Sequence, residues 1–168
     1  MSSGLLLWTD ETSAASLSDS QEGWSHAAAR DDAAPTFVFN PKGGRNHSGS
    51  LLTTSDKRPG LHGWWQRTVP VEGGRFYQFS AMRKAVNVDY PRRSAVARIF
   101  WIDEKGNAAI HDFNATTTYR EGERPRSEPE YPADGPTQSE GWTEVAGIFR
   151  CHESPRYLFR RSRKFVTR

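Results

Sequence analysis

Residues 60–81 read GLHGWWQRTVPVEGGRFYQFSA and decide the fold class. Tyr77, Phe79 and Ala81 alternate with polar residues, which is the period-two pattern of a strand with one face in a core. The Glu-Gly-Gly sequence before them reads as a turn, so we expect a hairpin of Gly63–Val71 and Arg75–Arg83. Short aromatic strands of this kind build antiparallel sandwiches, which favours a binding or accessory β-domain over a catalyst.

Alternation predicts further strands on both sides of this hairpin. Ala95, Ala97, Ile99 and Trp101 lie on one face of a strand within Ser94–Asp103. The other expected strands are Thr36–Asn40, Ser50–Thr54, Ala108–Phe113 and Gly141–Arg150. Residues 120–140 hold four prolines and are predicted to be irregular. No amphipathic helix longer than two turns is evident, so the predicted fold class is all-β and antiparallel.

The charge of the chain is unevenly distributed. The 168 residues, with a net charge of +3, suit one domain, but residues 156–168 contain six basic residues and no acid. Residues 1–155 therefore hold 17 basic and 20 acidic residues, a net charge of −3. Six cations at one end would attract phosphate. Because the body is acidic, we do not expect nucleic acid as a partner.

Cysteine content and hydropathy exclude several classes. Cys151 is the single cysteine, so an internal disulfide and a cysteine-based zinc site are excluded. No secretory signal with an apolar run of roughly 7–15 residues is present, and no segment approaches a membrane span. As written, the sequence predicts a soluble, cytoplasmic protein that does not bind a membrane.

We expect three parts along the chain. Residues 1–35 form an irregular lead-in with a first strand near Leu5–Trp8, residues 36–150 form the sandwich, and residues 151–168 form a basic tail. In this tail Leu158 and Phe159 are consecutive and arginines follow at once, which would put charge on an inward face. We therefore expect a disordered or truncated tail that leaves the sandwich without its last strand.

Several segments together resemble the galactose-binding-like jelly rolls found among carbohydrate-binding modules. They are GSL (49–51), GWWQ (63–66), VEGGRFYQFSA (71–81), ARIFWIDEKG (97–106) and GWTEVAG (141–147). The stretch PRRSAV (91–96) is similar to an N-terminal accessory domain of nitrilase-like carbon–nitrogen hydrolases in some bacterial proteins. The resemblance implies a sandwich of roughly eight antiparallel strands. The Glu–Lys–Cys catalytic domain of such hydrolases is absent from this sequence.

Five residues are candidates for ligand binding. Trp64 and Trp65 are adjacent and face opposite ways on a strand, so one can stack on a sugar ring while the other packs in the core; two packing residues are the alternative. Arg92 and Arg93 follow Pro91 in a loop beside Tyr90 and could bind a carboxylate or phosphate, with solvated loop charge as the alternative.

No catalytic motif, metal cluster or cofactor site is apparent. Calcium is common in related sandwiches, and Asp10, Glu11 and Asp56 could contribute to such a site, but they form no compact ligand motif. The predicted function is a non-catalytic accessory domain that binds a carbohydrate-like ligand or docks on a hydrolase domain. The alternative is a truncated N-terminal fragment of a carbon–nitrogen hydrolase without independent activity. Ligand identity and oligomeric state stay open.

Overall fold

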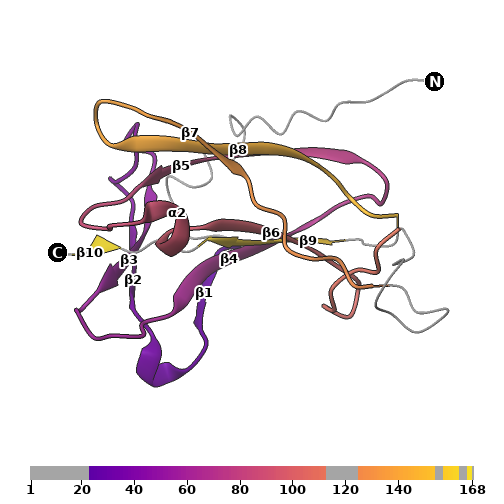
Figure 1. Ribbon diagram of the computed structural model, residues 1–168, viewed down its shortest axis with the longest axis horizontal. Coiled ribbons are helices and arrows are strands. Elements are labelled where there is room, and N and C mark those ends of the chain that lie inside the picture. The colour runs from indigo at the N-terminus through magenta and orange to yellow at the C-terminus, as the bar shows by residue number, and fades with distance from the viewer. Residues whose placement is uncertain (1–22, 113–124, 154–156, 163–165, 168) are drawn as a thin grey trace.

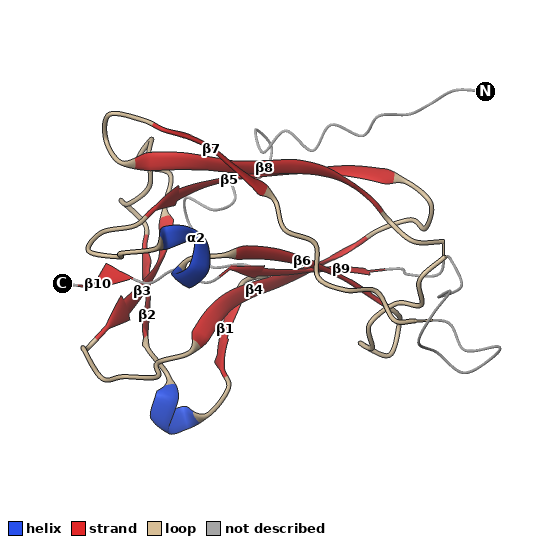
Figure 2. Ribbon diagram, viewed as in Figure 1, coloured by secondary structure: helices blue, strands red, loops and turns tan. Residues whose placement is uncertain are grey.

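The computed structural model describes residues 23–112, 125–153, 157–162 and 166–167 (Figure 1). Strands make up 47% of these residues. Helices within the described ranges are limited to two short turns, η1 (Asp31–Ala33) and α2 (Pro91–Ser94), drawn in blue in Figure 2. The predicted all-β class is therefore confirmed. The expected first strand near Leu5–Trp8 lies outside the described residues.

The described chain contains ten strands. They are β1 (Ser25–Ala28), β2 (Thr36–Asn40), β3 (Ser50–Ser55), β4 (Gly63–Pro70), β5 (Phe76–Lys84), β6 (Ala97–Ile102), β7 (Ala133–Thr137), β8 (Trp142–Arg150), β9 (Tyr157–Ser162) and β10 (Val166–Thr167). Three sheets result, with strand orders β1-β4-β9-β6, β10-β3-β2 and β5-β8-β7. Every pair is antiparallel except β3 with β10.

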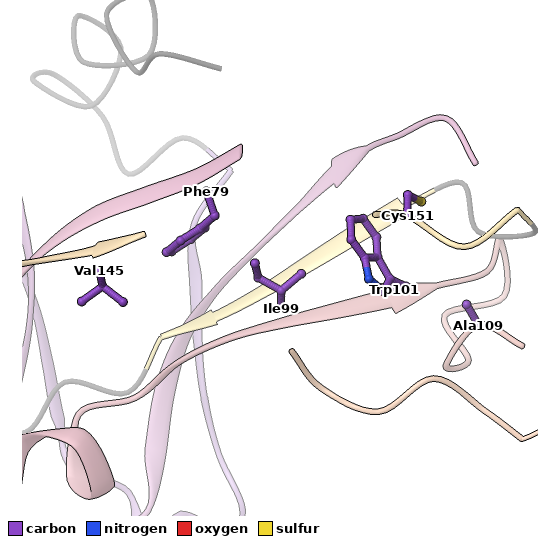
Figure 3. Close-up of a cluster of buried hydrophobic side chains, with 6 residues drawn as sticks. All are labelled: Phe79, Ile99, Trp101, Ala109, Val145 and Cys151. Carbon is purple, nitrogen blue, oxygen red and sulfur yellow. The ribbon is translucent and has the colours of Figure 1, made fainter. Parts of the chain in front are cut away.

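Two of these sheets face each other across the core. Figure 1 shows β5, β8 and β7 as one layer above β6, β9 and β4. The buried cluster between the layers joins Phe79 and Val145 of the upper sheet to Ile99 and Trp101 of β6 (Figure 3). Trp101 is fully buried, and its indole N–H donates to Glu130 Oε1 at 2.5 Å. The alternation predicted for β6 therefore marks its core face correctly.

The strands of the expected hairpin form, but they do not pair with each other. β4 pairs with β1 and β9, while β5 pairs with β8, so the chain crosses from one sheet to the other between them. Gly74 at φ +75° donates its N–H to the carbonyls of Cys151 and His152. A Cβ on Gly73 would lie 2.1 Å from the Glu153 carbonyl oxygen. The two glycines therefore allow the connection between β4 and β5 to pack closely against the backbone of residues 151–153. Because β4 and β5 belong to different sheets, the predicted hairpin is wrong.

Two strands lie where irregular chain was expected. β1 falls in the predicted lead-in and pairs with β4. β7 falls in the predicted loop of residues 120–140 and pairs with β8, with a register shift between Asp134 and Thr137. β7 is an edge strand, and an edge tolerates the Pro136 that argued against a strand. Within the described part of Ala108–Phe113, the expected strand is reduced to isolated bridges at Ala108 and Ile110.

The basic tail also pairs, contrary to the sequence prediction. β9 lies between β4 and β6, with Leu158 opposite Val69 and Trp101, and Phe159 opposite Thr68 and Phe100. The prediction relied on side-chain polarity, whereas the ladder is built by backbone groups that any non-proline residue supplies. The sandwich therefore has the closing strand that the sequence was expected to lack.

Deletion of residues 157–168 should abolish cooperative folding, because it removes a central strand and separates β4 from β6. We expect the truncated chain to lose its sigmoidal thermal transition followed by near-ultraviolet circular dichroism. A truncated chain that melts cooperatively within a few degrees of the full chain would contradict this placement of β9.

Candidate functional site

A cavity of about 450 Å³, the large hollow, opens where the β3–β4 connection meets the segment between β5 and β6 that contains α2. Its walls combine hydroxyl, amide, carboxylate and cationic side chains with one exposed aromatic ring. The lining residues are Ser55, Arg58, Gly60, Leu61, His62, Asn87, Val88, Asp89, Tyr90, Arg93 and Ser94. They come from the β3–β4 connection and from the segment between β5 and β6. Such a mixture can hydrogen-bond a polar ligand and stack on its apolar face.

Tyr90 and Arg93 are two exposed residues of the large hollow that contact each other. Tyr90 is 69% exposed, and the Arg93 guanidinium carbon lies 5.9 Å from the centre of the Tyr90 ring. The backbone N–H of Arg93 donates to the Tyr90 carbonyl in the turn of α2. Among the described residues no carboxylate or carbonyl accepts a hydrogen bond from the Arg93 side chain. Two of the predicted ligand-binding residues are therefore brought together.

Arg58 has a structural role in the wall of the same hollow. Its guanidinium donates to Asp56 Oδ2 at 2.8 Å and to the carbonyls of Asp32 and Ala34. The backbone N–H of Arg58 and then its side chain hold the pKa of the Asp56 carboxyl below its usual value. Asp56, a calcium candidate in the sequence, is thus engaged with Arg58. The other two candidates, Asp10 and Glu11, lie outside the described residues.

A second cavity of about 150 Å³, the small hollow, is lined in part by Arg92 of α2. Tyr131, which is 54% exposed, also lines it. Arg83, another lining residue, pairs with Asp134 at 2.5 Å and donates to the Ala95 carbonyl at 3.1 Å. Consecutive arginines of α2 therefore line different hollows.

Neither of the two adjacent tryptophans lines a hollow. Trp65 is 1% exposed, its indole N–H donates to the Leu52 carbonyl, and the rings of His26 and Phe37 contact it edge-on. The expectation that Trp65 is an exposed stacking residue is wrong, because this side chain fills the core face of β4. Trp64, on the opposite face, is half-buried, and its ring centre lies 5.5 Å from that of His62 in the large hollow.

Sequence reasoning missed most of the polar wall of the large hollow. Arg58 and His62 reach it from the β3–β4 connection, which is distant in sequence from Tyr90. Asn87 has φ +53°, a left-handed turn conformation that asparagine tolerates. An asparagine and an aspartate just before Tyr90-Pro91 are turn signals that could have marked the wall. No local signal in the sequence marks Arg58.

Cys151 is not available as a nucleophile. The side chain is fully buried in the core cluster. Burial, with a smaller effect of the Asp112 charge, raises the pKa of its thiol to about 12. The reactive form of cysteine is the thiolate. Cys151 therefore remains a protonated core residue at neutral pH.

Native protein should consequently resist labelling by a water-soluble disulfide reagent at pH 8, and one thiol should react after unfolding in urea. The absorbance of the released thiolate measures both rates. Stoichiometric labelling within seconds under native conditions would contradict the buried position of Cys151.

Asp112 is the centre of a charged cluster next to Cys151. Its Oδ2 accepts a hydrogen bond from Arg150 at 2.9 Å and lies 3.6 Å from His152 Nδ1, while its Oδ1 accepts the Glu153 N–H. Burial alone would raise the pKa of Asp112, but the Glu153 N–H, His152 and Arg150 outweigh it and hold this pKa below its usual value. The cluster thus holds the end of β8 and the residues that follow it, up to Glu153, against Asp112.

Because the folded-state pKa of Asp112 is lowered, its ionisation stabilises the fold above the unfolded value of 3.8, and this stabilisation is lost as the pH falls through the folded value. We expect Asp112→Asn to lower the free energy of unfolding by about 1–3 kcal/mol at pH 7, and by progressively less below pH 3.8. Urea denaturation at several pH values measures this. The exposed Asp31→Asn is the matched control, and an equal loss in both variants would contradict the role of Asp112.

Within the described ranges, no group of three or more histidine, cysteine, aspartate or glutamate side chains could hold a metal ion. None of the described helices is long and apolar enough to cross a membrane. Comparison of the chain with protein-family models, curated proteins and solved structures gave no match. The functional argument therefore depends on the residues themselves.

Proposed function

We propose that this chain is a non-catalytic binding domain whose large hollow takes a carbohydrate-like ligand. The proposal includes a jelly-roll sandwich of the galactose-binding-like class, which is the class that the sequence resembles. Two facing antiparallel sheets with almost no helix support this part of the proposal.

The observation that carries the proposed function is the position of Tyr90 in the large hollow. An exposed phenol ring beside the hydroxyl, amide and carboxylate groups of Ser55, Asn87 and Asp89 offers what a sugar requires. The ring can stack on the apolar face of a pyranose, while the polar groups exchange hydrogen bonds with its hydroxyls. The volume of the large hollow, about 450 Å³, is in the range of small-molecule sites.

The lining of the large hollow, and the core position of Cys151 outside it, support the proposed absence of catalysis. A positioned nucleophile or acid–base pair is required for covalent or general acid–base catalysis. Asp89 is the one carboxylate that lines the large hollow in the described structure, and the buried Cys151 thiol is not ionised at neutral pH. We propose that ligand binding there requires neither a metal nor a cofactor.

Tyr90→Ala should weaken saccharide binding by about tenfold, because a stacking ring contributes about 0.5–1.5 kcal/mol beyond its buried area. A glycan array on the wild-type protein identifies the ligand, and titration calorimetry measures the affinities of both proteins. Phe76→Ala is the matched control, since Phe76 is also an exposed ring, at 54%, but lines neither hollow. Equal saccharide affinities of the wild type and Tyr90→Ala would show that the large hollow is not the binding site.

Docking on a hydrolase domain is the second candidate function. Phe76 and Ile148 lie on the outer face of β5 and β8, 54% and 61% exposed, close to each other in the ladder where Phe76 opposes Arg150 and Gln78 opposes Ile148. Exposed apolar side chains that adjoin in this way are typical of contact surfaces. A folded protein that binds no saccharide would favour this candidate.

A further inference from the structure

We infer that the saccharide is acidic, with a carboxylate or sulfate group held by Arg93, and that a longer acidic chain also engages Arg92. This inference rests on the proposed function, because it names the chemical class of ligand for the same hollow. Its basis is the pair of consecutive guanidinium groups that α2 supplies to the two hollows.

Arg93 has the donors that an acidic ligand requires. Its side chain is exposed and meets the Tyr90 ring at 5.9 Å, a cation–π contact that orients the guanidinium without using its N–H groups. No acceptor from the described residues occupies those N–H groups. A guanidinium with five donors in a fixed fork matches the two oxygens of a carboxylate or sulfate. A sugar stacked on Tyr90 would place such a substituent beside this fork.

The other charges of the large hollow do not replace Arg93. The Arg58 guanidinium is committed to Asp56 and to two carbonyls, so its charge is balanced within the protein. Asp89 repels an anion and serves better as an acceptor for sugar hydroxyls. An anionic substituent is therefore expected at the Arg93 side of the hollow, and neutral hydroxyls are expected at the Asp89 side.

Arg92 offers a second guanidinium at the small hollow, where the Tyr131 ring is contacted by a different cation, Arg98, at 5.5 Å. Arg92 is exposed, no described residue accepts a hydrogen bond from its side chain, and the exposed ring of Tyr131 lines the same hollow. Arg83 in that hollow is already paired with Asp134, so of its two lining arginines Arg92 is the one whose donors have no acceptor among the described residues. Since α2 contributes to both hollows, a ligand that extends from the large hollow over α2 meets a second guanidinium.

Titration calorimetry at low ionic strength with two matched sugar series tests the inference. The series are galactose, galacturonate and galactose 6-sulfate, and the corresponding glucose compounds. We expect an acidic member to bind about three- to tenfold more tightly than its neutral parent, with an advantage that decreases as salt is added. Arg93→Gln should abolish this advantage, and Arg75→Gln, an exposed arginine that lines neither hollow, should preserve it.

Arg92 is tested with trigalacturonate. We expect Arg92→Gln to leave the affinity for the acidic monosaccharides unchanged and to reduce the affinity for the trimer by about threefold. Equal affinity for acidic and neutral sugars, or an acidic preference that survives Arg93→Gln, would overturn the inference and leave the proposed function standing. If no saccharide of any charge binds to the folded protein, the proposed function itself fails. A preference for the sulfate over the carboxylate supports the inference and identifies the anionic group.

Discussion

The ion pair between Arg83 and Asp134 is the interaction that holds the end of α2, the helical turn that contributes residues to both hollows. The two side chains are only 9% and 20% exposed, and Arg83 also donates to the carbonyl of Ala95, the residue that follows α2. A buried guanidinium without a partner is strongly unfavourable, so β5, β7 and the end of α2 have to keep their relative positions. The position of Arg92 and Arg93 is therefore fixed relative to β5 and β7, although α2 itself is a single turn.

The strands could be predicted from the sequence because burial of one face of a strand produces an alternation of apolar and polar residues. Thr36–Asn40 is a strand with the predicted bounds, and Ile99 and Trp101 are buried as their alternation indicates. Which strands pair with each other is not indicated by this local pattern. The segment Val71–Arg75 reads as a hairpin turn, yet the two strands beside it belong to different sheets, because contacts with residues 151–153 fix the path of the chain there.

The candidate site was accessible to sequence reasoning only where its residues are neighbours in the chain. Tyr90 and Arg93 could be proposed together because they flank one proline, and the structure brings them to one hollow. Arg58 enters this hollow through hydrogen bonds to the carbonyls of Asp32 and Ala34, which depend on the tertiary fold. Trp65 could not be separated from Trp64 by pattern, since alternation shows that they face opposite ways without showing which one faces the core.

The position of β9 has a consequence for how the protein is made. The lower sheet receives one of its two inner strands from residues 157–162, although its other strands lie between residues 25 and 102. On the ribosome, β4 and β6 therefore emerge long before the strand that joins them. Until it arrives, both present unpaired N–H and C=O groups on the sides that β9 will occupy, and such edges can pair with other nascent chains. The hazard of aggregation for this protein is thus concentrated in its synthesis, and a chaperone that holds the growing chain would act in that interval.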